Sequence, residues 1–229
     1  KINSSIINLN YLLNINYGDS VQNENLLNAL EEIIYFDSTV TTHNLFAAIL
    51  SKNLKKPNNQ ILDYLKQYIQ IHPEDIKGYL YLANLYFDNA EYIDAMHYYH
   101  RLLLIHPKHF EANLNMAKCL IALSDYERAL LQLEFTNKHD PNNFESKYYM
   151  GYCLYQSDEY TAAIKEFTQA LLLNSKDANT YYYLGKAYVR IDKKKQALES
   201  LDMSIKLDPY NGDAYFELGK IYESILKIN

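Results

Sequence analysis

Apolar residues recur along most of this chain in two alternating stripes. Within residues 178–209, apolar side chains at i, i+3, i+4 and i+7 begin at Tyr181, and a second stripe begins at Ala197. This spacing predicts two amphipathic helices. The polar segment 191–194 predicts a turn between them, and Pro209 predicts the end of the second helix, because proline has no N–H for the helical ladder. The segment is therefore predicted to be a hairpin of two antiparallel helices.

Small residues and prolines repeat with a period of 34 positions. The small residues predict close helix crossings, and they form two series: Ala95, Ala129, Ala163 and Ala197, and Ala83, Ala117, Gly151, Gly185 and Gly219. The prolines are Pro73, Pro107, Pro141 and Pro209, with Ser175 at the place where one is missing. A fixed period of this length is typical of a stacked array, in which each unit buries its apolar face against the next.

Short motifs within the period identify a family. Residues 181–188 and 215–222 both read Tyr-x2-Leu-Gly-x2-Tyr, residues 163–167 supply Ala-x3-Phe, and residues 95–99 supply Ala-x3-Tyr. Together with the prolines, these segments resemble the tetratricopeptide repeat. The resemblance implies an all-α fold, a right-handed α-solenoid of antiparallel helix hairpins. It covers residues 74–229 as units 74–107, 108–141, 142–175, 176–209 and a partial unit 210–229.

One place in the motif departs from the family. The chain has no tryptophan, and the opening place of the five units holds Tyr79, Asn113, Lys147, Tyr181 and Tyr215. Asn113 and Lys147 predict looser packing at the starts of their units.

The two ends of the chain are less regular. We expect residues 1–73 to be divergent helical hairpins that form an N-terminal cap, with a separate small domain as the alternative. The apolar residues around Ile6 and Leu26 indicate helices there, and residues 43–53 and 58–71 indicate a hairpin. Residues 213–227 indicate a single helix whose face with Leu218, Tyr222 and Ile225 lacks its usual cover. Three interpretations of this face are open: the native protein continues beyond Asn229 and covers it, the helix is itself the C-terminal cap, or another molecule covers it through self-association.

Charge and hydropathy narrow the possible partners. The chain has 28 acidic and 22 basic residues and a formal net charge of −6, which argues against generic nucleic-acid binding. No apolar run approaches the roughly 18 residues of a membrane span, so we expect no membrane insertion. The chain begins with Lys1, which leaves open an N-terminal signal or lipid anchor removed upstream. The compartment is therefore open between the cytoplasm and an envelope-facing location.

The sequence offers no catalytic or metal motif. Cys119 and Cys153 lie at equivalent places in neighbouring units, roughly 8–10 Å apart by helix packing, beyond the approximate 7 Å limit for a disulfide. We therefore expect both to be core residues. No nucleophile elbow, phosphate loop or zinc-protease motif is present, and the carboxylates of Glu111, Glu145 and Asp213 are spread along the repeats. The histidines His97, His100, His106 and His109 are interpreted as surface residues rather than metal ligands. From the missing motifs, the spread carboxylates and these histidines together, we expect no enzyme activity, cofactor or metal.

The resemblance also implies a binding surface. In such arrays the first helix of each unit lines the concave face, at three places per unit. The residues expected there include aromatic rings and amines, and the proposed groove comprises Asn84, Phe87, Lys118, Tyr148, Tyr152, Tyr155, Tyr182, Lys186, Arg190, Phe216 and Lys220. Aromatic side chains offer a large amphipathic contact area, and the amines favour an acidic ligand. Packing of the tyrosines between helices is the structural alternative.

These observations favour a non-catalytic scaffold that binds a peptide or helix of a partner protein. An adaptor that binds the C-terminal carboxylates of chaperones is disfavoured. Family members of that kind resemble one another in a lysine at the first groove place and an asparagine at the second, whereas this chain has no lysine at the first place and only Asn84 at the second. Two other hypotheses remain open. One is an assembly factor of a bacterial-type cell envelope, and the other is an accessory subunit of a carbohydrate-handling enzyme.

Overall fold

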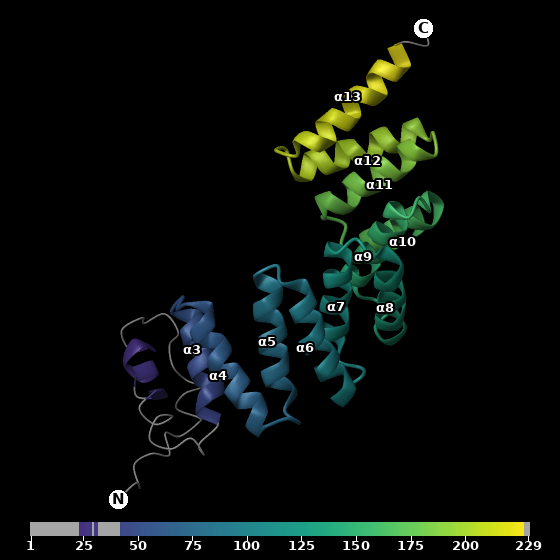
Figure 1. The fold of residues 1–229 in the computed structure, drawn as a ribbon. Coiled ribbons are helices and arrows are strands. Elements are labelled where there is room, and N and C mark those ends of the chain that lie inside the picture. Colours follow the sequence, from purple (N-terminus) through teal and green to yellow (C-terminus); the bar gives the residue numbers. More distant parts are fainter. Residues whose placement is uncertain (1–22, 29, 32–41, 227–229) are drawn as a thin grey trace, which may run out of the picture. The chain divides into compact units, whose positions relative to one another are not determined.

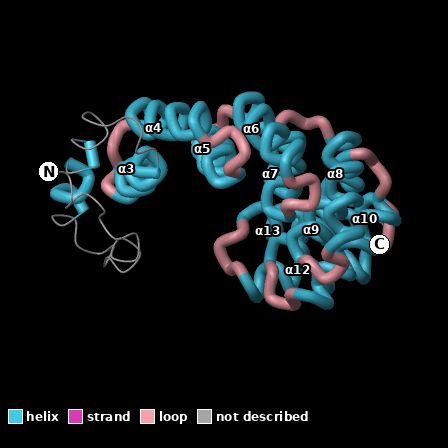
Figure 2. Tube along the Cα trace, turned by 90° about the horizontal axis from the view of Figure 1, so that it is seen from below, coloured by secondary structure: helices cyan, strands magenta, loops and turns pink. Residues whose placement is uncertain are grey.

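A computed structural model describes residues 23–28, 30–31 and 42–226 of the chain. The chain divides into two compact units, Lys1–Asn89 and Ala90–Asn229. The described residues form helices joined by short loops and contain no strand (Figure 2). The prediction of an all-α fold built from successive helix hairpins is confirmed. The boundary between cap and repeats at residue 73 stays a prediction.

In the first unit, α3 (Thr42–Asn53) and α4 (Asn58–Ile71) pack as a hairpin, and α5 (Ile76–Asp88) packs against α4. Residues 23–28 and 30–31 are also helical. Leu27 and Leu30 are buried with Ala47 of α3 in one apolar cluster. The predicted helix near Ile6 lies outside the described residues.

The second unit is a row of eight described helices (Figure 1). They are α6 (Tyr92–Ile105), α7 (Phe110–Ala122), α8 (Tyr126–His139), α9 (Phe144–Gln156), α10 (Tyr160–Leu173), α11 (Ala178–Arg190), α12 (Lys194–Leu207) and α13 (Gly212–Leu226). Each helix packs against the next in sequence, and α9 also contacts α7 and α11. The helices α7, α9, α11 and α13 thus form a ladder of first helices, with α8, α10 and α12 as their partners.

The helix ends follow from local chemistry. Side chains of Asp125, Asn143 and Asp177 accept hydrogen bonds from backbone N–H groups at the starts of α8, α9 and α11, which would otherwise lack partners. The helices α6, α8 and α12 all end two residues before a proline. The proline period therefore marks helix ends, as predicted.

The turns inside the hairpins repeat a strained conformation. Among the residues that the structure describes, five other than glycine have a positive φ of 54–63°: Lys55, Ala90, Ser124, Asp158 and Asp192. The last four are spaced by 34 residues. At Ser124 the N–H donates to the carbonyl of Ile121, and the next N–H donates to the carbonyl of Leu120. This bonding closes the C-terminus of α7 as a Schellman motif, which requires a left-handed residue.

The repeated small residues lie where helices approach closely. Ala129, Ala163 and Ala197 are fully buried. A Cβ added at Gly151 would lie 2.7 Å from the Phe167 ring, and one at Gly185 would lie 2.7 Å from Leu201 Cγ. The close-crossing interpretation is therefore right for these two glycines.

The same interpretation is wrong for Gly219. A Cβ at this residue would have no neighbouring atom within 4 Å. The reason is that α13 has no second helix packed across it within the described chain, whereas Gly151 and Gly185 each face the second helix of their own hairpin. On the same helix, Leu218 is buried against α12, while Tyr222 is 52 % exposed. The expected open face of α13 thus includes Tyr222 but not Leu218, and the side chain of Ile225 lies outside the described residues.

Asn113 and Lys147 link the two helices of their hairpins through polar contacts. The Asn113 carbonyl oxygen accepts a hydrogen bond from the Gln132 amide of α8. The Lys147 ammonium lies 3.0 Å from a carboxylate oxygen of Glu166 on α10, and both side chains are mostly buried. Two polar pairs therefore replace the tyrosine ring that other units carry at this place.

We expect Lys147→Met to lower the free energy of unfolding of the second unit by about 1–3 kcal/mol, because Glu166 would keep a mostly buried charge without its partner. Urea unfolding followed by circular dichroism measures the change. The double variant Lys147→Met/Glu166→Leu should recover most of the loss, since it buries no charge. A double variant as unstable as the single one would contradict this account.

No helix in the described part of the chain has both the length and the hydropathy needed to cross a bilayer.

Candidate functional site

Five tyrosines of α9 and α11 form a continuous cluster, which we call the aromatic surface: Tyr148, Tyr152, Tyr155, Tyr182 and Tyr183. The Tyr183 ring is its centre. Its centroid lies 5.1 Å from that of Tyr152, 5.8 Å from that of Tyr155 and 5.2 Å from that of Tyr182. All five side chains are half-buried. The two neighbouring first helices therefore present one surface of edge-to-face rings.

The five rings differ in depth. Tyr148 packs on Phe167 of α10 at 6.2 Å and on Tyr183 at 6.3 Å. Burial is the main cause that raises the pKa values of Tyr148 and Tyr183 well above their ordinary value, and burial raises that of Tyr182 to about 12. The hydroxyl of Tyr152 accepts a hydrogen bond from the amide of Gln156. Tyr148 is thus largely part of the core, and the other rings combine packing with exposure.

Lys186 on α11 supplies the positive charge of the aromatic surface. Its ammonium nitrogen lies 5.1 Å from the ring centroid of Tyr182, 5.3 Å from that of Tyr155 and 5.5 Å from that of Tyr183. These distances are typical of cation–π contacts. Lys186 has no carboxylate partner among the residues that the structure describes. A ligand carboxylate can therefore approach this ammonium without displacing an ion pair.

The other predicted amines already have carboxylate partners. Lys118 pairs with Glu145 at 2.9 Å, Lys220 with Glu217 at 2.9 Å, and Arg190 with Asp158 at 3.5 Å. Arg190 also lies 4.5 Å above the Tyr160 ring, and Lys220 lies 5.2 Å from the Phe216 ring. Their charges are partly neutralised within the protein, in contrast to that of Lys186.

The remaining predicted groove residues lie elsewhere. Asn84 and Phe87 belong to α5 of the first unit, and both are half-buried. Phe216 is on α13 and is 67 % exposed. The structure therefore brings together the predicted residues of α9 and α11, with Lys118 one helix earlier and Phe216 and Lys220 one helix later in the ladder.

Sequence reasoning missed Tyr183, the centre of the cluster. It sits one place after Tyr182 in the motif, outside the three groove places that the resemblance supplies. The equivalent residue in the preceding 34-residue repeat is Tyr149, whose ring centroid lies 5.3 Å from the Lys118 ammonium. The repetition of tyrosine at this fourth place was the available signal.

A hollow adjoins the aromatic surface at the start of α11, the end of α12 and the start of α13. It has a volume of about 460 Å³ and is lined by Tyr182, Tyr183, Asp208 and Asp213, among others. Tyr210, which is 96 % exposed, stands at its edge. The aromatic surface therefore continues into a wide depression that is also lined by carboxylates.

The two cysteines lie in the core, and two of the histidines lie near each other. Cys119 and Cys153 are free and buried, and burial raises both thiol pKa values to about 12. The His106 and His109 rings lie 5.9 Å apart. Within the described residues, no group of three or more His, Cys, Asp or Glu side chains is close enough to hold a metal ion.

Many solved structures share this fold, and three of them are compared with the chain below. YrrB, described as a TPR protein with an unusual peptide-binding site, has a TM-score of 0.70 and 19% identity, covering 82% of this chain and 96% of YrrB. MamA from Desulfovibrio magneticus RS-1 (41-end) has a TM-score of 0.70 and 20% identity, covering 75% of this chain and 97% of its own. Another MamA structure has a TM-score of 0.61 and 25% identity, and the match covers 65% of this chain and 81% of that MamA chain. No curated protein sequence matches the chain significantly.

Three family models match by sequence. Two are described as tetratricopeptide repeat and match residues 87–150 and 179–209, and one is described as TPR repeat and matches residues 151–192. Together they span residues 87–209, which is more than half of the 229 residues. With the hairpins, the helix-ending prolines and the shared fold of the solved structures, these matches show that the chain belongs to the tetratricopeptide repeat family.

Proposed function

We propose that this chain is a non-catalytic scaffold that holds a peptide or helix of a partner protein against the aromatic surface. The observation that carries the proposal is the arrangement around Lys186. Three half-buried tyrosine rings surround its ammonium, which has no carboxylate partner in the described part of the chain. The ligand is accordingly a segment with an acidic side chain or a terminal carboxylate.

The chemistry of the aromatic surface suits a peptide. Tyrosine gives a large contact area at a low cost in side-chain entropy, and its hydroxyl can bond peptide groups. The rings of Tyr152, Tyr155, Tyr182 and Tyr183 lie side by side on two helices and so offer contacts along an extended segment rather than around one compact molecule. The similar structure YrrB is described as having a peptide-binding site, which supports this class of ligand.

A carboxylate bound at Lys186 gains from its surroundings. The rings partly desolvate the ammonium, so a charge-assisted bond to it is stronger than one to a lysine in open water. The ring faces hold the ammonium near one position, which lowers the entropy cost of ordering this long side chain. We therefore expect affinity of about 1 µM, corresponding to roughly −8 kcal/mol.

Panning a random peptide library on the purified protein tests the proposal. We expect the recovered peptides to be enriched in Asp or Glu, and the triple variant Tyr152→Ala/Tyr182→Ala/Lys186→Ala to bind them at least about 30-fold more weakly, the effect of losing about 2 kcal/mol at a hot spot. Tyr148 is left in place because it packs on Phe167, and its loss would disturb the core.

The control variant changes exposed apolar residues of second helices, Leu131→Ala/Leu172→Ala, which are 62 % and 74 % exposed. It should bind the peptides as the wild type does. Equal binding by the triple variant and the wild type, with both folded by circular dichroism, would reject the aromatic surface as the binding site. Recovered peptides without acidic residues would reject the role of Lys186.

A further inference from the structure

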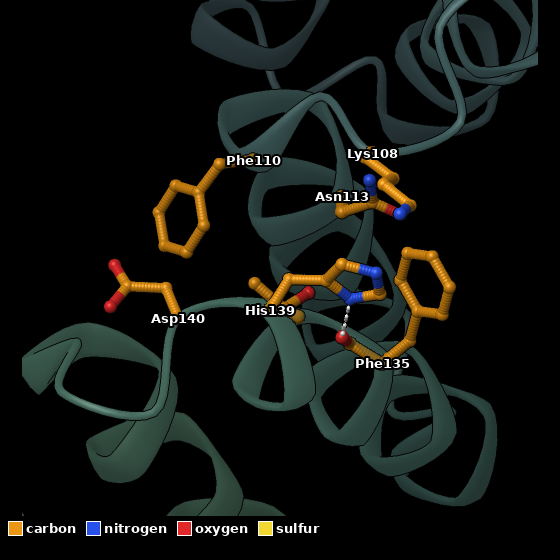
Figure 3. Close-up of a pocket in the computed structure, with 7 residues that line it drawn as sticks. Lys108, Phe110, Asn113, Phe135, His139 and Asp140 are labelled. Atoms are coloured by element: carbon orange, nitrogen blue, oxygen red, sulfur yellow. Dashed lines mark hydrogen bonds between the residues drawn. The ribbon is translucent and has the colours of Figure 1, made fainter.

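A separate pocket lies between the start of α7 and the end of α8, with a volume of about 210 Å³ (Figure 3). Its apolar walls are the rings of Phe110 and Phe135, and Asn113, Thr136 and His139 complete the lining. Lys108 and Asp140 also border it. It shares no residue with the aromatic surface.

The pocket lies beside the place where a side-chain ring is missing. Asn113 stands at the opening place of its unit, where Tyr79, Tyr181 and Tyr215 stand in others. The asparagine is 3 % exposed, and its amide is fully engaged: Nδ2 donates to the carbonyls of Pro107 at 3.0 Å and His109 at 2.8 Å, and Oδ1 accepts from Gln132. It is therefore fixed and does not swing into the space beside it.

The walls are also particular to this unit. Phe135 takes the place that Arg101, Gln169 and Met203 hold in other units, and His139 takes the place of Ile105, Leu173 and Leu207. The Phe135 and His139 rings contact each other with centroids 4.6 Å apart. An aromatic wall and an imidazole thus occur in one of the two repeats that lack the opening ring, the one that carries Asn113.

His139 gives the pocket a hydrogen-bond acceptor. Its Nδ1 lies 2.9 Å from the carbonyl oxygen of Phe135. A carbonyl can only accept, so Nδ1 carries the proton, and Nε2 of the neutral imidazole keeps a lone pair. Figure 3 shows Nε2 on the side of the ring that faces Asn113. No other hydrogen bond to this ring occurs among the described residues.

We propose that this pocket is an anchor site for a tyrosine side chain presented by a partner protein. The ring lies between Phe110 and Phe135, and its hydroxyl donates to Nε2 of His139. The size fits, because an apolar cavity of about 150 Å³ holds benzene, whereas sites for drug-sized molecules occupy about 300–1,000 Å³. The acceptor at the imidazole favours tyrosine over phenylalanine.

The probe for the test is N-acetyl-L-tyrosinamide, titrated into the full chain and followed by NMR shifts of the His139 and Phe135 rings. We expect a Kd of about 1 mM, as suits one side chain. N-acetyl-L-phenylalaninamide should bind about fivefold more weakly, because it has no hydroxyl to donate a hydrogen bond to Nε2 of His139. Equal affinity of the two probes would overturn the role of His139.

Two variants locate the site. Asn113→Tyr restores the ring that other units carry and should abolish binding of the tyrosine probe. His139→Phe keeps the shape and should bring the tyrosine probe down to the affinity of the phenylalanine probe. Both variants should melt within a few degrees of the wild type. Unchanged tyrosine binding by a folded Asn113→Tyr variant would overturn the proposal.

Analytical ultracentrifugation separates a partner's tyrosine from one on a second copy of this chain. The exposed Tyr210 is the obvious candidate on a second copy. We expect the wild type and Tyr210→Ala to sediment alike. Self-association that is lost in both Tyr210→Ala and Asn113→Tyr would overturn the assignment to a partner protein.

Discussion

Replacing Phe167 with alanine is expected to lower the free energy of unfolding of the second unit by about 3–5 kcal/mol. The ring is fully buried and packs against Tyr148 of α9 at 6.2 Å and Tyr183 of α11 at 6.1 Å. It therefore stabilises its own hairpin and the contact with the next one, and in an array both terms support the fold.

Urea unfolding followed by circular dichroism measures the loss. The control is Leu172→Ala on the same helix, where the side chain is 74 % exposed and the change should stay within about 0.5 kcal/mol. A loss below about 1 kcal/mol for Phe167→Ala would contradict the packing described above.

Gly151 allows a sharper version of the same test. A Cβ at residue 151 would lie 2.7 Å from two atoms of the Phe167 ring, so Gly151→Ala should cost about 1–3 kcal/mol through overpacking. In a Phe167→Leu background the added methyl group has more room, and its cost should fall. A double-mutant cycle with no coupling between the two sites would show that the ring is not what requires glycine there.

Raising the pH above 9 is expected to destabilise the protein strongly. Burial raises the thiol pKa values of Cys119 and Cys153 from 9.0 to about 12. The unfolded chain therefore releases these protons at lower pH than the folded one. The contribution of these two buried thiols to the free energy of unfolding is fully present below pH 9 and is lost progressively as the pH rises toward 12. At about 1.36 kcal/mol per pKa unit, each thiol accounts for about 2–3 kcal/mol by roughly pH 11.

Urea unfolding at a series of pH values from neutral to alkaline tests this dependence. The double variant Cys119→Ala/Cys153→Ala should show a shallower fall. Some slope should remain, because Tyr148, Tyr182 and Tyr183 also have raised pKa values. Stability that stays level to pH 11, or the same slope with and without the thiols, would contradict burial of these thiols as the cause.

Much of the fold could be predicted from the sequence because the information repeats. The period places Pro107 and Pro141 at helix ends and Ala129 and Ala163 at helix crossings, and the structure confirms each. The turns were less visible. Left-handed residues usually reveal themselves as glycine, but here the left-handed places hold Ala90, Ser124, Asp158 and Asp192.

The candidate site depends on contacts across helices, which a period does not specify. Lys118, Lys186 and Lys220 occupy the same place in three repeats, while Tyr152 holds it in the repeat between the first two. Only Lys186 of these lysines lacks a carboxylate partner in the described residues. The difference arises because Glu145 and Glu217 happen to lie within reach of the other two. The central position of Tyr183 likewise follows from how α11 faces α9, which sequence spacing alone does not give.

The turn geometry shared by Ser124, Asp158 and Asp192 has a consequence for the evolution of the chain. The helices α7, α9 and α11 each end just before such a left-handed residue. A gene duplication or deletion of 34 codons therefore joins one of these turns to the continuation of another. The length of the scaffold can therefore change by one whole helix hairpin at a time, and each added or removed hairpin leaves the orientation of its neighbours unchanged.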